Sequence, residues 1–330
     1  MKIKNILLGI ALFPMVVNAE NEYKLVWEDN FDGTKLDETI WTAEYSRRGG
    51  GNAEMQYYIP EAATIEKHPS GVSCLVLNAK RENYKGRPAT SARLNTQDKL
   101  MFTYGKLEAR IQLPKTANGL WPAFWMLGND LANNLGDDDS VDAMKKQLKK
   151  EGKVIWPKCG EIDILECGHA TGIKEGTQDR YFNGACHWGE DFNGGAYPNF
   201  GMNTTAEESI QGEFHTFTLI WDKEAIKMYL DLDKNPDAKP YYNLPIAGKK
   251  KKNAPARYFC KPFYITLNLA VGGYFTGIHE DEKYPAEISA DSKNFQKITA
   301  LPKDGTPAKM YVDYIRLYQK GEKGEQFIKK

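Results

Sequence analysis

Apolar and polar residues alternate along much of the chain, and this period of two predicts β-strands. Four segments rich in β-branched and aromatic residues show the pattern: 73–79, 104–113, 263–271 and 311–318. Two more, at 215–221 and 226–232, flank the short stretch 222–225 and predict a hairpin. Many short strands joined by Gly, Asn and Pro turns indicate an all-β chain folded as an antiparallel β-sandwich.

One segment departs from the strand pattern. Val141, Met144 and Leu148 recur at helical spacing within the charged stretch 139–153, which predicts either a surface helix or a disordered charged loop. The chain contains no internal repeat and no Pro- or Ser-rich linker between its strands. We therefore expect a single domain.

The first 19 residues differ in character from the rest of the chain. They start with basic residues, continue as a short apolar run and end in small residues up to Ala19. This is typical of a secretory signal peptide over 1–19, cleaved near Ala19, and the apolar run is too short to span a bilayer. We expect a secreted or periplasmic protein with its domain over 20–320 and a charged tail at 321–330.

Composition narrows the range of partners. The chain carries 44 basic and 44 acidic residues, and this balance gives no indication of nucleic-acid binding. Its 18 tyrosines and 7 tryptophans are enough to form flat stacking surfaces as well as a core. The five cysteines are an odd number with no zinc-ribbon spacing, so we expect most of them to be small buried hydrophobic residues.

The segment 159–167 (CGEIDILEC) places three carboxylates in an otherwise apolar strand. Glu161 and Asp163 alternate with isoleucines, but Glu166 is out of phase because Leu165 takes the next polar position. A β-bulge near Leu165 would return Glu166 to the face of the other two acids. The isoleucines would then face the core and hold the strand in place.

Three carboxylates on one face repel each other, so at least one should hold a proton near neutral pH. Retaining glycoside hydrolysis requires such an arrangement, with an ionised nucleophile and a protonated acid roughly 5–5.5 Å apart. The pattern alone leaves two alternatives open, a solvated strand face and a three-oxygen Ca²⁺ site. The apolar neighbours and Gly160 argue against an open edge.

The run E-I-D-I-L-E resembles the E-x-D-x-x-E signature of glycoside hydrolase family 16, the β-jelly-roll endo-glycanases that include laminarinases. Further segments similar to that family occur in the family's order: 25–33, 54–58, 90–94, 119–127 and 311–318. The resemblance implies a jelly roll with a concave sugar-binding cleft. It also implies a monomer that acts on a polysaccharide and needs no cofactor for its chemistry.

The resemblance also implies roles for the acidic strand and for two tryptophans. Glu161 corresponds to the nucleophile, Asp163 to its helper and Glu166 to the general acid/base. Trp121 and Trp125 match tryptophans that form the floor of the sugar cleft, although core packing is the commoner role for Trp.

Other site residues are implied by the same resemblance. Arg93 matches a cleft arginine, and Asn52 and Glu54 lie near the position of a polar sugar-contacting loop. His187 lies in a segment that resembles the strand facing the acids, where a structural role and a sugar contact are both open. Asp313 matches a residue that in many relatives helps to hold a structural Ca²⁺.

The sequence departs from laminarinases near the expected cleft. After Gly273 the chain continues with Tyr274 and Phe275, where laminarinases typically carry N-W-P-G, and the insertion 129–157 also differs. Tyr274 is therefore a candidate sugar contact. We expect β-1,3-glucan of the laminarin type as substrate. The alternatives are endo-β-1,4-galactosidase action on poly-N-acetyllactosamine of mucin or keratan chains, and a sugar-binding sandwich without catalysis.

Overall fold

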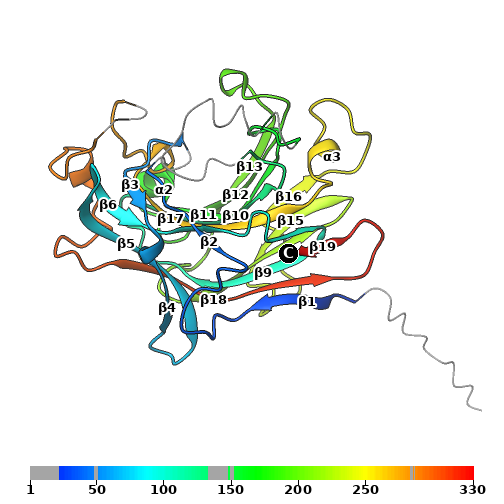
Figure 1. Ribbon diagram of the computed structural model, residues 1–330, viewed down its shortest axis with the longest axis horizontal. Coiled ribbons are helices and arrows are strands. Elements are labelled where there is room, and N and C mark those ends of the chain that lie inside the picture. Colours follow the sequence, from blue (N-terminus) through cyan, green and yellow to red (C-terminus); the bar gives the residue numbers. More distant parts are fainter. Residues whose placement is uncertain (1–21, 48–50, 133–147, 149–151, 283–284, 286) are drawn as a thin grey trace, which may run out of the picture.

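The computed structural model describes residues 22–47, 51–132, 148, 152–282, 285 and 287–330. Within them, the strands form two sheets stacked face to face, as the jelly-roll prediction requires (Figure 1). Neighbouring strands in both sheets are antiparallel except for the parallel pair β3 and β6. The expected signal peptide at 1–19 and nearly all of the charged stretch 139–153 lie outside the described residues.

The nine-stranded sheet carries the acidic segment. Its strands in spatial order are β13 (Asn199–Thr205), β12 (Tyr181–His187), β11 (Glu161–Cys167), β10 (Leu120–Gly128), β17 (Phe263–Val271), β7 (Arg93–Asn95) and β2 (Thr42–Ala43). Strand β8 (Leu100–Thr103) also pairs with β17, and β19 (Gln326–Lys329) pairs with β8.

The ten-stranded sheet covers the opposite side of the core. Its strands in spatial order are β16 (Tyr242–Pro245), β15 (Ala225–Leu230), β14 (Phe214–Trp221), β9 (Gly105–Gln112), β18 (Ala308–Gln319), β5 (Ser73–Tyr84), β6 (Arg87–Ser91) and β3 (Gln56–Tyr58). Strand β1 (Lys24–Asp29) pairs with β18, and β4 (Ala63–Lys67) pairs with β5.

Apart from Leu148, which is helical, helical structure among the described residues is confined to short turns. They are α2 (Ala170–Glu175), α3 (Pro255–Tyr258) and the 3₁₀ turns η3 (Pro60–Ala62), η4 (Asn193–Gly195), η5 (Tyr274–Thr276) and η6 (Phe295–Lys297). None of the described helices is long and apolar enough to cross a bilayer.

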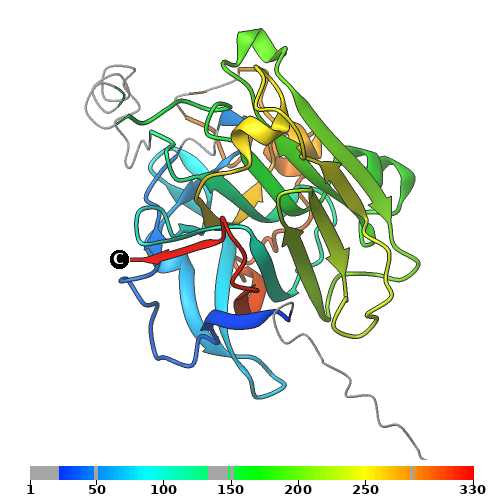
Figure 2. The ribbon, with the colours of Figure 1, turned by 90° about the vertical axis from the view of Figure 1, so that its right-hand side faces the viewer.

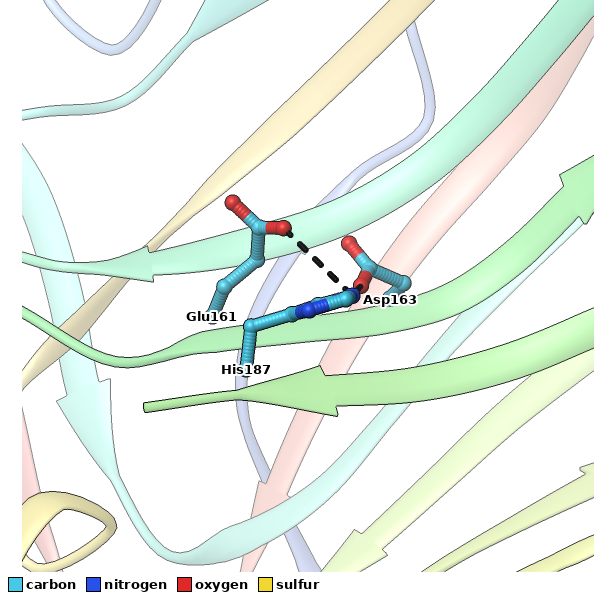
Figure 3. A group of neighbouring side chains, drawn as sticks. All are labelled: Glu161, Asp163 and His187. Atoms are coloured by element: carbon cyan, nitrogen blue, oxygen red, sulfur yellow. Dashed lines mark ion pairs between the residues drawn. The ribbon is translucent and has the colours of Figure 1, made fainter. Parts of the chain in front are cut away.

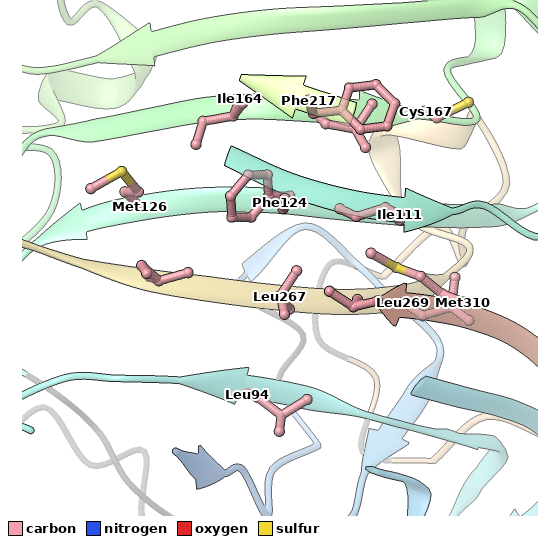
Figure 4. Close-up of a cluster of buried hydrophobic side chains, with 14 of the residues drawn as sticks. Leu94, Ile111, Phe124, Met126, Ile164, Cys167, Phe217, Leu267, Leu269 and Met310 are labelled. Atoms are coloured by element: carbon pink, nitrogen blue, oxygen red, sulfur yellow. The ribbon is translucent and has the colours of Figure 1, made fainter. Parts of the chain in front are cut away.

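The core lies between the sheets and explains the alternating pattern. Leu94, Phe124 and Leu267 project from the nine-stranded sheet toward Ile111 and Phe217 of the other sheet, and all five are fully buried (Figure 4). The four strands predicted from period-two segments are confirmed as β5, β9, β17 and β18, and the predicted hairpin is confirmed as β14 and β15.

Two expectations outside the core have different outcomes. The charged tail expected at 321–330 instead contributes β19, whose residues Gln326–Lys329 pair with β8, because Phe327 and Ile328 can cover the apolar residues of the sheet edge (Figure 2). All five cysteines are unpaired, and every one except Cys260 is buried, as expected for small hydrophobic side chains.

Candidate active site

Strand β11 contains the β-bulge that the broken acidic pattern predicts. Against β10, Trp125 pairs with Asp163 and Phe124 pairs with Leu165, so Ile164 is the extra residue. The register against β12 shifts over the same span. Ile164 and Leu165 are both fully buried in the core, which places the bulge where two consecutive apolar side chains need burial.

The bulge brings Glu166 to the face that carries the first two acids. Glu161 and Glu166 are half-buried, and Asp163 is buried between them. Each acid lies opposite a residue of β12: Glu161 pairs with His187, Asp163 with Ala185 and Glu166 with Asn183. The three carboxylates therefore share the face of the nine-stranded sheet that points away from the core.

His187 joins the first two acids of this face. Its Nε2 atom lies 3.3 Å from Asp163 Oδ2 and 4.0 Å from Glu161 Oε1, and the three side chains converge (Figure 3). The Tyr197 hydroxyl lies 3.2 Å from Nδ1 on the other side of the ring. The sequence left the role of His187 open; in the structure it is in contact with the candidate catalytic acids.

Glu161 is held in a place that resists ionisation. Burial first, and then the negative charge of Asp163, raise the pKa of Glu161 to about 8. His187 and the Trp156 indole N–H, which donates to Glu161 Oε2 at 3.0 Å, oppose that shift. These two groups stabilise the ionised form that a nucleophile needs.

Glu166 has a different pair of donors. The Trp121 indole N–H donates to Oε1 and the Asn183 amide donates to Oε2, each at 3.0 Å. Burial raises the pKa of Glu166 despite these donors, and burial followed by the charge of Glu166 raises the pKa of Asp163 well above its usual range. The three acids therefore retain protons toward neutral pH, and a protonated carboxyl is available as a general acid.

Trp121 and Trp125 lie on the same face as the acids but make different contacts. The Trp121 ring is stacked on Phe275, with centroids 4.5 Å apart and planes 8° apart, and only 9% of the residue is exposed. Trp125 is half-buried, donates to Asn268 Oδ1 at 2.7 Å and has the Arg93 guanidinium 4.8 Å from its ring centroid. Trp121 is thus fixed by Phe275 and directed at Glu166.

Arg93 and Glu54 belong to a buried polar group beside the tryptophans. Arg93 Nε lies 3.3 Å from Glu44 Oε1. Glu54 accepts hydrogen bonds from Gln56 at 2.8 Å and from the Tyr58 hydroxyl at 2.9 Å. Burial raises the pKa of Glu54 to about 7, opposed first by the charge of Arg93.

The two loop residues proposed as sugar contacts lie next to each other. The Tyr274 backbone N–H donates to the Asn52 carbonyl at 2.9 Å, and both side chains are exposed. Gly273 directly precedes Tyr274, and a Cβ added there would be 3.4 Å from the Trp121 ring and 3.0 Å from the Asn52 carbonyl oxygen. The Tyr274 ring itself packs edge-on against His279.

Sequence reasoning missed several polar and aromatic residues of the site. They are Trp156, Asn183, Tyr197 and Asn268. The sequence did contain an indication for Asn183, because Asn183 and His187 are four residues apart and therefore lie on the same face of strand β12. Trp156 and Tyr197 had none, because each lies in a loop where no period indicates which way a side chain points.

Asp313 lies on β18 of the other sheet, away from the acids. Its carboxylate accepts a hydrogen bond from Arg110, and Asn30 Oδ1 accepts one from Arg316 at 3.4 Å. The Arg110 guanidinium therefore engages the carboxylate that the resemblance assigned to a structural Ca²⁺, and a carboxylate paired with a cation does not fit a calcium ion at Asp313.

The described residues hold one set of three potential metal-binding side chains, Glu161, Asp163 and His187, whose donor atoms lie within 4.8 Å of one another. Such a set of two carboxylates and one imidazole resembles a transition-metal site more than a calcium site, since Ca²⁺ prefers six to eight oxygens. The same atoms are those expected to perform the chemistry.

Known proteins resemble this chain both in sequence and in structure. The sequence model of glycosyl hydrolases family 16 matches residues 53–244. A β-glucanase of Rhodothermus marinus is 30% identical over 302 residues, which are 90% of this chain and 85% of that protein. The family 16 endo-glucanase of Bacteroides ovatus, solved with G4G3G-2F-DNP, has a TM-score of 0.68 at 32% identity and covers 89% of this chain and 100% of its own.

Two further relatives bear on the alternatives raised by the sequence. A β-1,3-glucan-binding protein of Penaeus monodon is 30% identical over 76% of this chain and 74% of its own length. A keratan-sulfate endo-1,4-β-galactosidase of Sphingobacterium multivorum is 24% identical over 91% of this chain and 56% of its own length.

Proposed function

Because the chain belongs to glycosyl hydrolases family 16, we propose that it is a retaining endo-β-glycosidase that cleaves internal bonds of β-1,3-glucan of the laminarin type. The observation that carries the proposal is the bulge at Ile164, which puts Glu161 and Glu166 on one face with separate hydrogen-bond donors. A protein that only bound sugar would have no use for two such acids.

In the first step the ionised Glu161 attacks the anomeric carbon and the glycosidic C–O bond breaks. Glu166 gives its proton to the departing oxygen, so that no alkoxide is released. Asp163 and His187, 3.3 Å apart, fix the orientation of Glu161 and hold the charge beside it. The product of this step is a covalent glycosyl ester of Glu161.

In the second step water replaces the leaving sugar. The water oxygen attacks the anomeric carbon while the ionised Glu166 takes a proton from the water. The ester bond to Glu161 breaks, and Glu161 departs as a carboxylate. Two inversions leave the configuration of the cleaved bond unchanged. Since Glu161 has to be ionised at the start, activity should rise as pH approaches its pKa of about 8.

β-1,3-Glucan is the proposed substrate because a glucan endo-1,3-β-glucosidase of Cryptopygus antarcticus is 30% identical over 86% of this chain, whereas the keratan-sulfate galactosidase is a more distant relative at 24% identity. Tyr274 and Phe275 replace residues of the laminarinase pattern, and Phe275 stacks on Trp121, so we expect these two residues to influence the sugar specificity.

The test is release of new reducing ends from laminarin, a mixed-linkage β-glucan and a keratan-type lactosamine chain. Short gluco-oligosaccharides from laminarin, first appearing with the β configuration, would support the proposal. Cleavage of the lactosamine chain with none of laminarin would overturn the choice of sugar. Laminarin binding without cleavage by the wild-type protein would support the binding-only alternative.

We further propose that the enzyme acts as a secreted or periplasmic protein, on the basis of the signal-like residues 1–19, and as a monomer, on the basis of the family resemblance. An extracellular or periplasmic enzyme meets intact polysaccharide, which suits endo-cleavage. Fractionation of expressing cells, together with N-terminal sequencing of the mature protein, tests the compartment and the cleavage near Ala19.

A further inference from the structure

Three aromatic side chains lie together beside the Glu161 end of the acidic strand. The Trp156 ring centroid lies 4.8 Å from that of Tyr197 and 5.7 Å from that of Phe192, and the Phe192 and Tyr197 centroids are 5.7 Å apart. We call these three residues the aromatic shelf. Phe192 is 45% exposed, which is unusual for a ring that contacts two other aromatic rings.

The shelf is attached directly to the catalytic acids. Trp156 donates its indole N–H to Glu161 at 3.0 Å, and the Tyr197 hydroxyl lies 3.2 Å from His187 Nδ1. A ligand lying on the shelf would therefore touch side chains that also position the reacting atoms.

The loop that carries Phe192 and Tyr197 is held in place at its base. Glu190 receives hydrogen bonds or ion pairs from Lys158 at 2.9 Å, Arg257 at 3.0 Å and Tyr258 at 3.0 Å. The Trp188 backbone N–H donates to the Pro198 carbonyl at 3.0 Å, which closes the loop between β12 and β13 (green, Figure 1). A loop fixed in this way presents its rings without first having to order them.

The sheet order places the shelf opposite the other expected sugar contacts. Trp121 and Trp125 lie on β10 and Arg93 lies on β7, all on one side of β11, whereas the shelf adjoins β12 on the other side. An enzyme that cleaves within a chain has to hold sugars on both sides of the broken bond. Apart from His187, the contacts expected from the sequence serve only one of those sides.

We propose that the aromatic shelf binds a pyranose ring of the polysaccharide on the far side of the cleaved bond from Trp125 and Arg93. This inference rests on the proposed function. The C–H face of a pyranose packs on an aromatic plane, and Tyr197 and His187 supply polar atoms beside that plane for its hydroxyl groups. Exposed Phe192 would be covered by the sugar.

Phe200 offers a matched control for Phe192. It is 39% exposed on the neighbouring strand β13, but it lies opposite Cys186, which faces the core, and packs against Tyr242 of the other sheet with ring centroids 5.5 Å apart. Phe192→Ala and Phe200→Ala thus remove similarly exposed rings, only one of which adjoins the acids.

The experiment measures kcat and KM on laminarin, and calorimetric binding of β-1,3-gluco-oligosaccharides of increasing length to each variant in a Glu161→Gln background. Phe192→Ala should raise KM and weaken binding of the longer oligosaccharides by roughly tenfold, with kcat changed less, because the contact is made before and during the reaction. Phe192→Trp should restore binding, and Phe200→Ala should match the wild type.

Equal oligosaccharide binding by the Phe192→Ala and Phe200→Ala proteins would overturn the proposal that the aromatic shelf binds a sugar. If the wild type cleaves no laminarin, the proposed function fails, and the same binding comparison is made with the mixed-linkage glucan and the lactosamine chain. Weaker binding of either glycan by Phe192→Ala alone would then support the shelf, and no difference on any of the three would overturn it.

Discussion

Glu161 on the nine-stranded sheet and Asp231 beside the ten-stranded sheet are both partly buried acids with a histidine nearby, yet their pKa values move in opposite directions. Burial alone would raise the pKa of Asp231, but His215 at 2.8 Å, the Thr216 backbone N–H and Lys234 outweigh it and lower that pKa to about 2. The pKa of Glu161 rises to about 8.

The difference lies in the balance of charges around each carboxylate. Asp231 receives donors from three residues and has no acid among its main influences. Glu161 has one donor, Trp156, and the charge of His187 4.0 Å away, but two further acids, Asp163 and Glu166, lie close enough to oppose its ionisation. A carboxylate that stabilises the fold is surrounded by donors, whereas acids gathered on one face weaken the fold and supply the proton chemistry.

The largest expected difference between Glu161 and Asp231 is the effect of their substitution on catalytic activity. Glu161→Gln should lower kcat at least about a thousandfold because no other group can form the covalent intermediate. Glu166→Gln should be similarly slow on polysaccharide but partly recover on aryl glycosides, whose leaving groups need no acid. Asp231→Asn should retain activity. Wild-type turnover by Glu161→Gln would exclude it as the nucleophile.

The opposite pKa shifts of Glu161 and Asp231 predict opposite changes of folding stability with pH. The raised pKa of Glu161 means that the wild type loses stability between about pH 4.5 and 8, so Glu161→Gln should gain on the order of 3 kcal/mol over it at pH 8 and little at pH 4.5. The lowered pKa of Asp231 contributes about 2 kcal/mol above pH 4, lost as pH falls toward 2.

Urea unfolding at pH 4.5 and 8, monitored by fluorescence, measures both effects on the folding free energy. Asp231→Asn should be less stable than the wild type at both values, since both lie above the ordinary pKa of Asp. A Glu161→Gln protein with the same stability difference from the wild type at both pH values would contradict the raised pKa.

A smaller effect is expected when the hydrogen bond from Trp156 to Glu161 is removed. Trp156→Phe removes the N–H at 3.0 Å that favours the ionised carboxylate, so the pKa of Glu161 should rise further. The acidic limb of the kcat/KM profile should then move upward by about one pH unit or less. Trp188→Phe, whose indole donates to the Asn253 carbonyl instead, is the control and should leave the limb in place.

The smallest effect is expected at Asp313. Its ion pair with Arg110 is partly exposed, with side-chain exposures of 18% and 33%, so Asp313→Asn should cost about 1 kcal/mol or less and leave activity unchanged. Calcium or a chelator should not change Tm, because Arg110 already engages the carboxylate. A calcium-dependent rise in Tm that Asp313→Asn abolishes would instead support a calcium site.

The sequence was sufficient for features that depend on local pattern. Period-two segments predicted β5, β9, β17 and β18, and the single break in that period after Asp163 predicted the bulge. Both arise from the requirement that apolar side chains face the core.

What could not be predicted depends on contacts between distant segments. Nothing local to Phe275 indicates that it stacks on Trp121, 154 residues earlier in the chain, or that this stack directs the indole N–H at Glu166. Strand β19 could not be predicted for a similar reason. Its charged neighbours indicated a solvent-exposed tail, and its partner β8 lies more than 200 residues earlier in the chain. The outcome of such pairings is set by the complete fold.

Because none of its cysteines is paired, the stability of the protein should not depend on the redox conditions around it. Burial raises the pKa of the Cys74, Cys159, Cys167 and Cys186 thiols, which keeps them protonated and unreactive at neutral pH. Folding therefore requires no oxidant, and reductant should not weaken the sandwich. Cys260, the one partly exposed thiol, lies just after α3 and offers a single position for a maleimide dye, from which movement of this part of the molecule during polysaccharide binding could be monitored without removing any other cysteine.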